Sequence, residues 1–219
     1  MSFSITEENY IKAIFHLQQE DGTVSTNDLS AVLQTKPASV TDMLKKLKTK
    51  KLLSYERYKG VRLSAEGRRL ALGIVRKHRL WEYFLFNTLQ FGWDEVHEIA
   101  EELEHVTSKK LVEKLDAFLG YPRFDPHGDP IPDSHGKMTV RQQLNLIDLP
   151  VNKMAEVSGV GSQSSELLEL LKHRNISMGT KLEVKRRFSF DHSLEIRIKG
   201  QQPFIISQQL AQALFVKLV

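Results

Sequence analysis

Hydrophobic residues recur at helical spacing through the N-terminal part of the chain. This pattern predicts helices over residues 4–19, 25–33 and 37–51, and a long helix that begins at residue 64. The first helix opens with the capping-box sequence SITE. The third carries Pro37 in its first turn, where proline is best tolerated. The predicted elements begin with a compact three-helix bundle.

Between the third and fourth helices the hydrophobic pattern changes to alternation. Residues 53–57 and 61–63 alternate on either side of a Lys-Gly turn, which predicts a two-stranded hairpin. Three helices followed by a hairpin is the order of a winged helix-turn-helix DNA-binding domain. The same elements also occur in modules that bind only protein, so their order leaves both interpretations open.

The pattern of hydrophobic and polar residues changes in the second half of the chain. A further helix is predicted over residues 94–119, and four of the seven prolines then fall between residues 122 and 132, which excludes regular structure there. Short strand-like pieces (KLEVKRRF, LEIRI, PFIIS and LFVKLV) follow and predict a small barrel. The fold class expected is mainly α with a small β part, in domains 1–72, 73–140 and 141–219.

Composition narrows the class of protein. With 41% hydrophobic and 26% charged residues the chain is typical of a soluble globular protein. It has no apolar run of about 20 residues and no signal-peptide layout at its start, so we expect a cytoplasmic protein that does not bind membranes. There is no cysteine, so a bound metal would need His, carboxylate, amide, Met or backbone ligands.

The charge is concentrated in one segment. Residues 36–69 hold eleven basic and three acidic side chains, a net +8 within a chain of net +4. Such a block indicates a polyanion-binding surface, although a solvated face is the simpler alternative. If the surface binds DNA, six basic residues can meet phosphates: Lys36, Lys45, Lys46, Arg57, Lys59 and Arg62. The exposed small and polar residues of the third helix can approach bases: Ala38, Ser39, Thr41 and Asp42.

The segment VHEIAEELEH places histidine and glutamate side chains on one helix face. His97, Glu101, Glu104 and His105 fall within an arc of about 100° on a helix. His78 and Glu82 lie four residues apart on the preceding helix. A solvated acidic face is the alternative, but imidazole with carboxylate suits divalent first-row metals, in one or two sites.

Catalytic patterns are not met. Glu102-x-x-His105 resembles half of a di-iron bundle motif, but no second Glu-x-x-His occurs. The sequence HEIAE lacks the second histidine of a zinc protease, and phosphate loops and nucleophile elbows do not occur. We therefore predict no enzyme, with a metal-buffering or metalloenzyme helical protein as the alternative from another class.

In order, the winged-helix pattern, RKHRLWEYFL, VHEIAEELEHVTS and DPHGDPIPD make the chain resemble the metal-dependent repressors of the diphtheria toxin repressor and manganese transport regulator family. The resemblance implies an N-terminal winged helix, a helical dimerisation and metal-binding domain, and a C-terminal SH3-like (FeoA-like) barrel. It also implies a homodimer that binds a palindromic operator of metal uptake genes, with Mn(II) or Fe(II) as corepressor.

The family's functional residues carry over by position. The primary metal site matches Glu101, Glu104, His105 and, from the first helix, Asn9. The ancillary site matches His78, Glu82 and His97, completed from the barrel by Glu166 with Gln163 behind it. This makes up to two ions per subunit. The base-contacting region falls on residues 37–42, which adds Pro37 to the DNA-binding candidates.

Departures from the family pattern bear on the choice of metal. Iron-type members have cysteine at the position of Glu101, so a hard oxygen ligand there favours Mn(II), with Fe(II) as the alternative. Asn9 stands where manganese-type members usually have aspartate. Lys12 stands where members without a barrel have a second glutamate, so their paired-ion arrangement is not expected.

Overall fold

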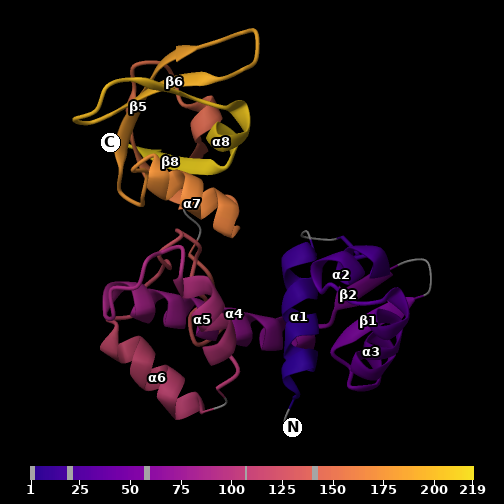
Figure 1. The fold of residues 1–219 in the computed structure, drawn as a ribbon. Coiled ribbons are helices and arrows are strands. Elements are labelled where there is room, and N and C mark those ends of the chain that lie inside the picture. The colour runs from indigo at the N-terminus through magenta and orange to yellow at the C-terminus, as the bar shows by residue number, and fades with distance from the viewer. Residues whose placement is uncertain (1–2, 19–21, 57–59, 107, 140–142) are drawn as a thin grey trace. The chain divides into compact units, whose positions relative to one another are not determined.

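The computed structural model describes residues 3–18, 22–56, 60–106, 108–139 and 143–219 (Figure 1). The chain divides into two compact units. The first unit comprises Met1–His78, Glu101–Lys114 and Pro132–Lys137, and the second comprises Arg79–Ala100, Leu115–Ile131 and Met138–Val219. None of the helices described is both long and apolar enough to cross a lipid bilayer.

A winged helix-turn-helix forms the N-terminal part of the first unit, as predicted. Its elements are α1 (Ile5–Leu17), α2 (Thr26–Val32), α3 (Pro37–Thr49), β1 (Leu53–Glu56) and β2 (Gly60–Leu63). Ser4 closes the predicted capping box with Glu7, and the Ser25 side chain caps α2. The two strands pair antiparallel, and Val24 bridges to Val61. The helices pack on a buried core that includes Ile11, Ile14, Leu29, Leu44 and Leu47.

The helical part contains α4 (Ala65–Asn87), α5 (Val96–Leu103) and α6 (Lys109–Phe118). The prediction of one continuous helix over residues 94–119 was wrong. Glu104 and His105 form a turn after α5, and the Ser108 hydroxyl accepts the amide of Leu111 at 3.3 Å to cap a new helix. Because the helix ends at Leu103, Glu104 and His105 lie in a turn and not on a continuous helix.

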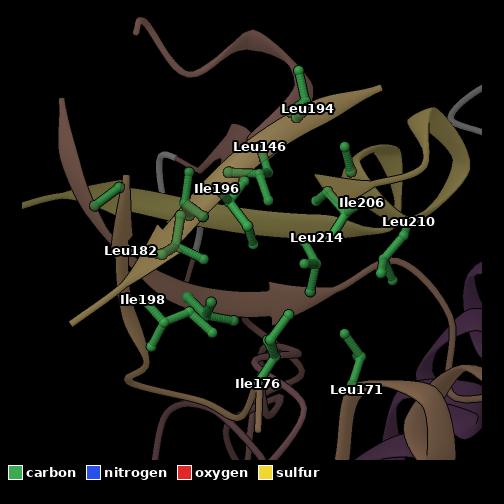
Figure 2. Close-up of a cluster of buried hydrophobic side chains, with 14 of the residues drawn as sticks. Leu146, Leu171, Ile176, Leu182, Leu194, Ile196, Ile198, Ile206, Leu210 and Leu214 are labelled. Atoms are coloured by element: carbon green, nitrogen blue, oxygen red, sulfur yellow. The ribbon is translucent and has the colours of Figure 1, made fainter. Parts of the chain in front are cut away.

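The C-terminal part of the second unit is a six-stranded antiparallel sheet in the order β3-β8-β4-β5-β6-β7. The strands are β3 (Leu144–Asn145), β4 (Met154–Val160), β5 (Lys181–Arg187), β6 (Leu194–Ile198), β7 (Phe204–Ile206) and β8 (Leu214–Leu218), with the helices α7 (Ser165–His173), α8 (Gln208–Gln212) and the 3₁₀ turn η1 (Leu146–Asp148). Figure 2 shows the buried leucine and isoleucine core on which the domain depends. The sheet is open, which corrects the predicted barrel: its edge strands β3 and β7 are two and three residues long and make no ladder with one another in the described chain.

Buried Glu7 joins α1 to α3. Its Oε1 accepts from Lys50 Nζ at 2.6 Å and lies 3.1 Å from Lys46 Nζ. Burial alone would raise the pKa of Glu7. Hydrogen bonds from Lys50, the Ser4 amide and Lys46 outweigh burial and lower the pKa from 4.5 to about 2. Glu7 therefore links the two helices through buried, charged contacts with the lysines.

Acid should weaken the contacts between Glu7 and the two lysines. Because the folded-state pKa lies below the ordinary value, the contribution of Glu7 is complete above pH 4.5 and is lost as the pH falls towards about 2. We expect Glu7→Gln to destabilise the protein by about 1–3 kcal/mol at pH 7 and to reduce the loss of stability over that acid range. Urea unfolding followed by circular dichroism across this pH range measures both effects. The exposed Glu66→Gln is the control, and a Glu7→Gln curve parallel to the wild type would contradict the assignment.

Candidate metal centres and DNA-facing helix

One polar cluster in the first unit draws on α1 and on the end of α5. We call Glu8, Glu101, Glu104 and His105 the first cluster. His105 Nδ1 lies 2.7 Å from Glu8 Oε2, and His105 Nε2 lies 3.7 Å from Glu104 Oε1. Lys12 Nζ donates to Glu101 Oε1 at 2.6 Å and to Glu104 Oε2 at 2.7 Å. His105 therefore contacts both Glu8 and Glu104, and Lys12 joins Glu104 to Glu101, where α1 faces residues 101–105.

Glu104 is the most enclosed member of the first cluster, with a fully buried side chain. Its Oε2 also accepts a hydrogen bond from His78 Nδ1 at 2.7 Å. Burial would raise the pKa of Glu104, but the His78 hydrogen bond and the positive charge of Lys12 outweigh it and lower the pKa. Glu104 therefore stays a buried carboxylate, held by cationic or imidazole neighbours.

Glu8 was not among the ligands predicted from the sequence. It lies one turn before Lys12 on α1, and its only visible signal was this i, i+4 spacing, which by itself indicates a surface pair. Asn9, the residue predicted to bind metal from α1, has a buried Oδ1 that receives no hydrogen bond within the described chain. Asn9 remains a prediction, and Glu8 joins it as the α1 residue in contact with His105.

The donors of the first cluster fit a divalent metal ion. Oxygen ligands with one imidazole suit Mn(II), Fe(II) and similar ions. Glu104 Oε1 is buried and receives no hydrogen bond from any described residue, which is a costly arrangement for a carboxylate oxygen and one that a bound cation would relieve. Glu8, Glu101, Glu104 and His105 are the residues that would hold the ion.

A second cluster lies wholly within the second unit. It consists of Glu82 on α4 with Asp125 and His127 in the proline-rich loop, all buried, with one ligand atom of each within 4.8 Å of the others. His97 on α5 is next to it, with Nδ1 3.2 Å from Glu82 Oε1. Glu82 and His97 were predicted from the sequence as metal ligands, whereas the proline-rich loop was read only as a domain boundary and a family motif. An Asp-x-His spacing in an irregular segment has no periodicity that would mark Asp125 and His127 as ligands.

The ring of His127 is oriented for a metal ligand. Its Nε2 lies 2.8 Å from the carbonyl oxygen of Trp93, which can only accept, so Nε2 carries a proton. The Trp93 ring stacks on it at 6.1 Å. Nδ1 is buried, makes no hydrogen bond with a described residue and lies 3.7 Å from Glu82 Oε1. Metal-binding histidines commonly donate one ring N–H to a backbone carbonyl in this way, which leaves the other ring nitrogen to coordinate the metal.

The surroundings of Asp125 in the second cluster disfavour its charged form. Burial, then the negative charges of Glu82 and Asp129, raise the pKa of Asp125 to about 8, although Arg79 Nε lies 3.5 Å from its Oδ2. Its Oδ1 accepts the amides of His127 at 2.8 Å and Asp129 at 3.0 Å, which shapes the loop. A divalent ion bound by these side chains would add to the positive charge of Arg79 and favour the ionised carboxylates.

The remaining predicted ligands have separate places. The sequence grouped His78 with Glu82 and His97, and within its own unit His78 contacts Glu104. Gln163 Nε2 donates to Asp129 Oδ2 at 3.1 Å, close to the loop of the second cluster. Glu166 is exposed in the first turn of α7. Its proposed ligand role remains a prediction.

The predicted DNA-facing residues of α3 are solvent-accessible. Lys36, at its N-cap, makes no side-chain capping bond and is exposed. The exposed residues are Lys36, Pro37, Ala38, Ser39, Asp42, Lys45, Lys46 and, on β2, Arg62, and Thr41 is half-buried. Lys45 pairs with Asp42 at 3.0 Å. Arg57 and Lys59 lie outside the described residues.

Three domain models from known families match the chain in succession. Residues 2–61 match the iron dependent repressor N-terminal DNA binding domain, and residues 64–133 match the iron dependent repressor metal binding and dimerisation domain. Residues 144–218 match the FeoA domain.

Individual relatives agree with these matches. The iron-dependent repressor IdeR of Mycobacterium leprae is 31% identical over 127 residues, covering 58% of this chain and 55% of that protein, so the match spans about half the length of such relatives. The HTH-type transcriptional regulator MntR of Geobacillus kaustophilus is 31% identical over 114 residues, which are 52% of this chain and 80% of that protein. A solved manganese-dependent transcriptional repressor in complex with manganese has 31% identity and a TM-score of 0.84, with 97% of this chain and 100% of that chain covered.

Gly128 tests how the loop positions the second cluster. Its φ is +90°, and an added Cβ would lie 2.2 Å from the carbonyl oxygen of Ser158 on β4, while the His127 carbonyl accepts the Val160 amide at 3.1 Å. We expect Gly128→Ala to lift the loop and to weaken divalent metal binding by the second cluster about tenfold or more. Gly200→Ala is the control, because its φ of +86° gives similar strain with nothing within 4 Å. Calorimetric titration with Mn(II) measures both, and equal affinities would contradict this role of the loop.

Proposed function

The chain belongs to the family of metal-dependent repressors that includes the diphtheria toxin repressor and the manganese transport regulators, and on this premise we propose that it is a Mn(II)-dependent DNA-binding repressor of metal uptake genes. In this proposal it works in the cytoplasm, catalyses no reaction, and binds a palindromic operator as a homodimer. The observation that carries the proposal is the first cluster, in which Glu8 of α1 contacts His105, and His105 in turn lies beside Glu104.

The first cluster supports metal control because it ties the DNA-binding helices to residues outside them. A bound divalent ion supplies the positive charge that holds the carboxylates of this cluster together. Glu8 on α1 and His105 in the turn after α5 then keep α1 in one orientation. To move an active conformer from about 1:99 to 99:1, the ion must favour it roughly 10⁴-fold, about 5.5 kcal/mol.

The neighbouring residue on α1 extends this control to α3. Glu7 contacts Lys46 and Lys50 of the recognition helix, whereas Glu8, the next residue, contacts His105. An orientation of α1 fixed through Glu8 is therefore passed to α3 through the buried Glu7. In a homodimer, this sets the spacing of two recognition helices for the two halves of an operator.

The ligand types favour Mn(II). Glu101 supplies a hard oxygen where iron-type relatives have cysteine, and the first cluster adds two further carboxylates with a single imidazole. Fe(II), which accepts similar ligands, is the close alternative. The second cluster, with Glu82, Asp125 and His127, supports a second ion in each subunit.

The metal dependence of DNA binding is the main test. We expect Glu104→Gln to abolish Mn(II)-dependent binding to the chain's own promoter region, because the buried position then loses the charge that attracts the ion. A gel shift with and without Mn(II) measures this, and Glu102→Gln, an exposed neighbour, is the control. Wild-type binding that ignores Mn(II) would refute the corepressor role, and a Glu104→Gln protein that responds at wild-type Mn(II) concentrations would refute the site.

The DNA-facing assignment has its own test. Lys36 is exposed at the start of α3, and we expect Lys36→Gln to weaken operator binding and to reduce the slope of log K against log salt by about one. Fluorescence anisotropy over a salt series measures the slope. Lys114→Gln removes the same charge from the exposed surface of α6 and should leave it unchanged. A Lys36→Gln slope equal to the wild type would show that this lysine does not meet a phosphate.

A further inference from the structure

Lys12 lies among the acidic residues of the first cluster. It is on α1, one helical turn after Glu8, and its side chain is 13% exposed. Its ammonium group contacts two carboxylates at once, Glu101 Oε1 at 2.6 Å and Glu104 Oε2 at 2.7 Å. These are the strongest hydrogen bonds a lysine makes, because donor and acceptor are both charged.

The same two carboxylates are the ligands that the proposed metal site needs. The ammonium group of lysine donates three protons and accepts none, so Lys12 in this charged form opposes a cation and does not bind one. An ammonium group and a divalent ion held by the same oxygens repel each other strongly in a site this enclosed. Lys12 has a long flexible stem, which allows its charged end to leave for solvent while the stem still covers the helix.

We infer that Lys12 competes with the metal ion for Glu101 and Glu104 and thereby sets the metal concentration at which the protein responds. The inference rests on the proposed function, since it concerns the same first cluster. Beside the hydrogen bond from His78, Lys12 gives the buried Glu104 a positive partner that a divalent ion can replace. The ammonium group of Lys12 keeps the carboxylates of the site in place in the absence of metal, but raises the metal concentration needed for binding.

A second lysine provides a matched comparison. Lys77 Nζ lies 4.0 Å from Glu8 Oε2, with its side chain 15% exposed, so it adds the same charge to the cluster without bridging Glu101 and Glu104. General attraction between the cluster and the ion would respond equally to the loss of either lysine. Direct competition makes Lys12 much more important than Lys77.

The experiment is calorimetric titration of the full chain with Mn(II). The binding step to follow is the one that Glu104→Gln removes. We expect Lys12→Gln and Lys12→Met to bind Mn(II) at this step about tenfold more tightly than the wild type, and Lys77→Gln to differ from it by less than about threefold. Lys12→Arg keeps the charge and should bind like the wild type. Tighter binding cannot come from a variant that merely disrupts the fold, so the sign of the change separates competition from a structural role.

The outcomes separate this inference from the proposed function. If both neutral variants bind Mn(II) as the wild type does, or more weakly, Lys12 does not compete, and the metal site stands as long as Glu104→Gln removes the step. If Lys77→Gln gains as much as Lys12→Gln, competition for the two carboxylates is likewise refuted. If Glu104→Gln binds Mn(II) like the wild type, the site itself is wrong and the inference fails with it.

Discussion

The buried carboxylate of Glu104 is the group on which the arrangement of the first unit depends. Removing a carboxylate from water costs several kcal/mol unless positive or hydrogen-bonding groups surround it. His78 from α4, Lys12 from α1 and His105 from the turn after α5 supply them, at 2.7, 2.7 and 3.7 Å. One charge therefore draws three separate segments together. The same requirement for positive charge makes the position suitable for a divalent metal.

Helix α1 has two charged faces with different partners. Glu7 is buried against the lysines of α3, and Glu8 contacts His105 in the turn after α5. Because the two glutamates are adjacent on one rigid helix, a change in the partner of Glu8 moves the partner of Glu7 as well. In the proposed function, these two adjacent glutamates couple the metal site to the DNA-binding helix α3.

Sequence analysis predicted the elements whose patterns are local. Capping at Ser4, the proline at the start of α3 and the alternating hairpin located the winged helix correctly. The break in the helix after Leu103 was not predicted, because the hydrophobic spacing continues across the break. The one local signal is Ser108, which caps the start of the next helix. Asp125 and His127 were not predicted as site residues, since the geometry that joins them to Glu82 is tertiary. Helical periodicity placed Glu101 and Glu104 on one face as candidate metal ligands, and the family resemblance then grouped them in one site with His105.

Hydrogen–deuterium exchange of the intact protein with and without Mn(II) tests the central claim most directly, because the claim concerns the coupling of α1 to residues 101–105. The account predicts that Mn(II) slows amide exchange in α1 (Ile5–Leu17) and in residues 101–105 of the wild type, and that this protection is lost in Glu104→Gln. Protection confined to the loop of the second cluster, with α1 unchanged, would contradict it.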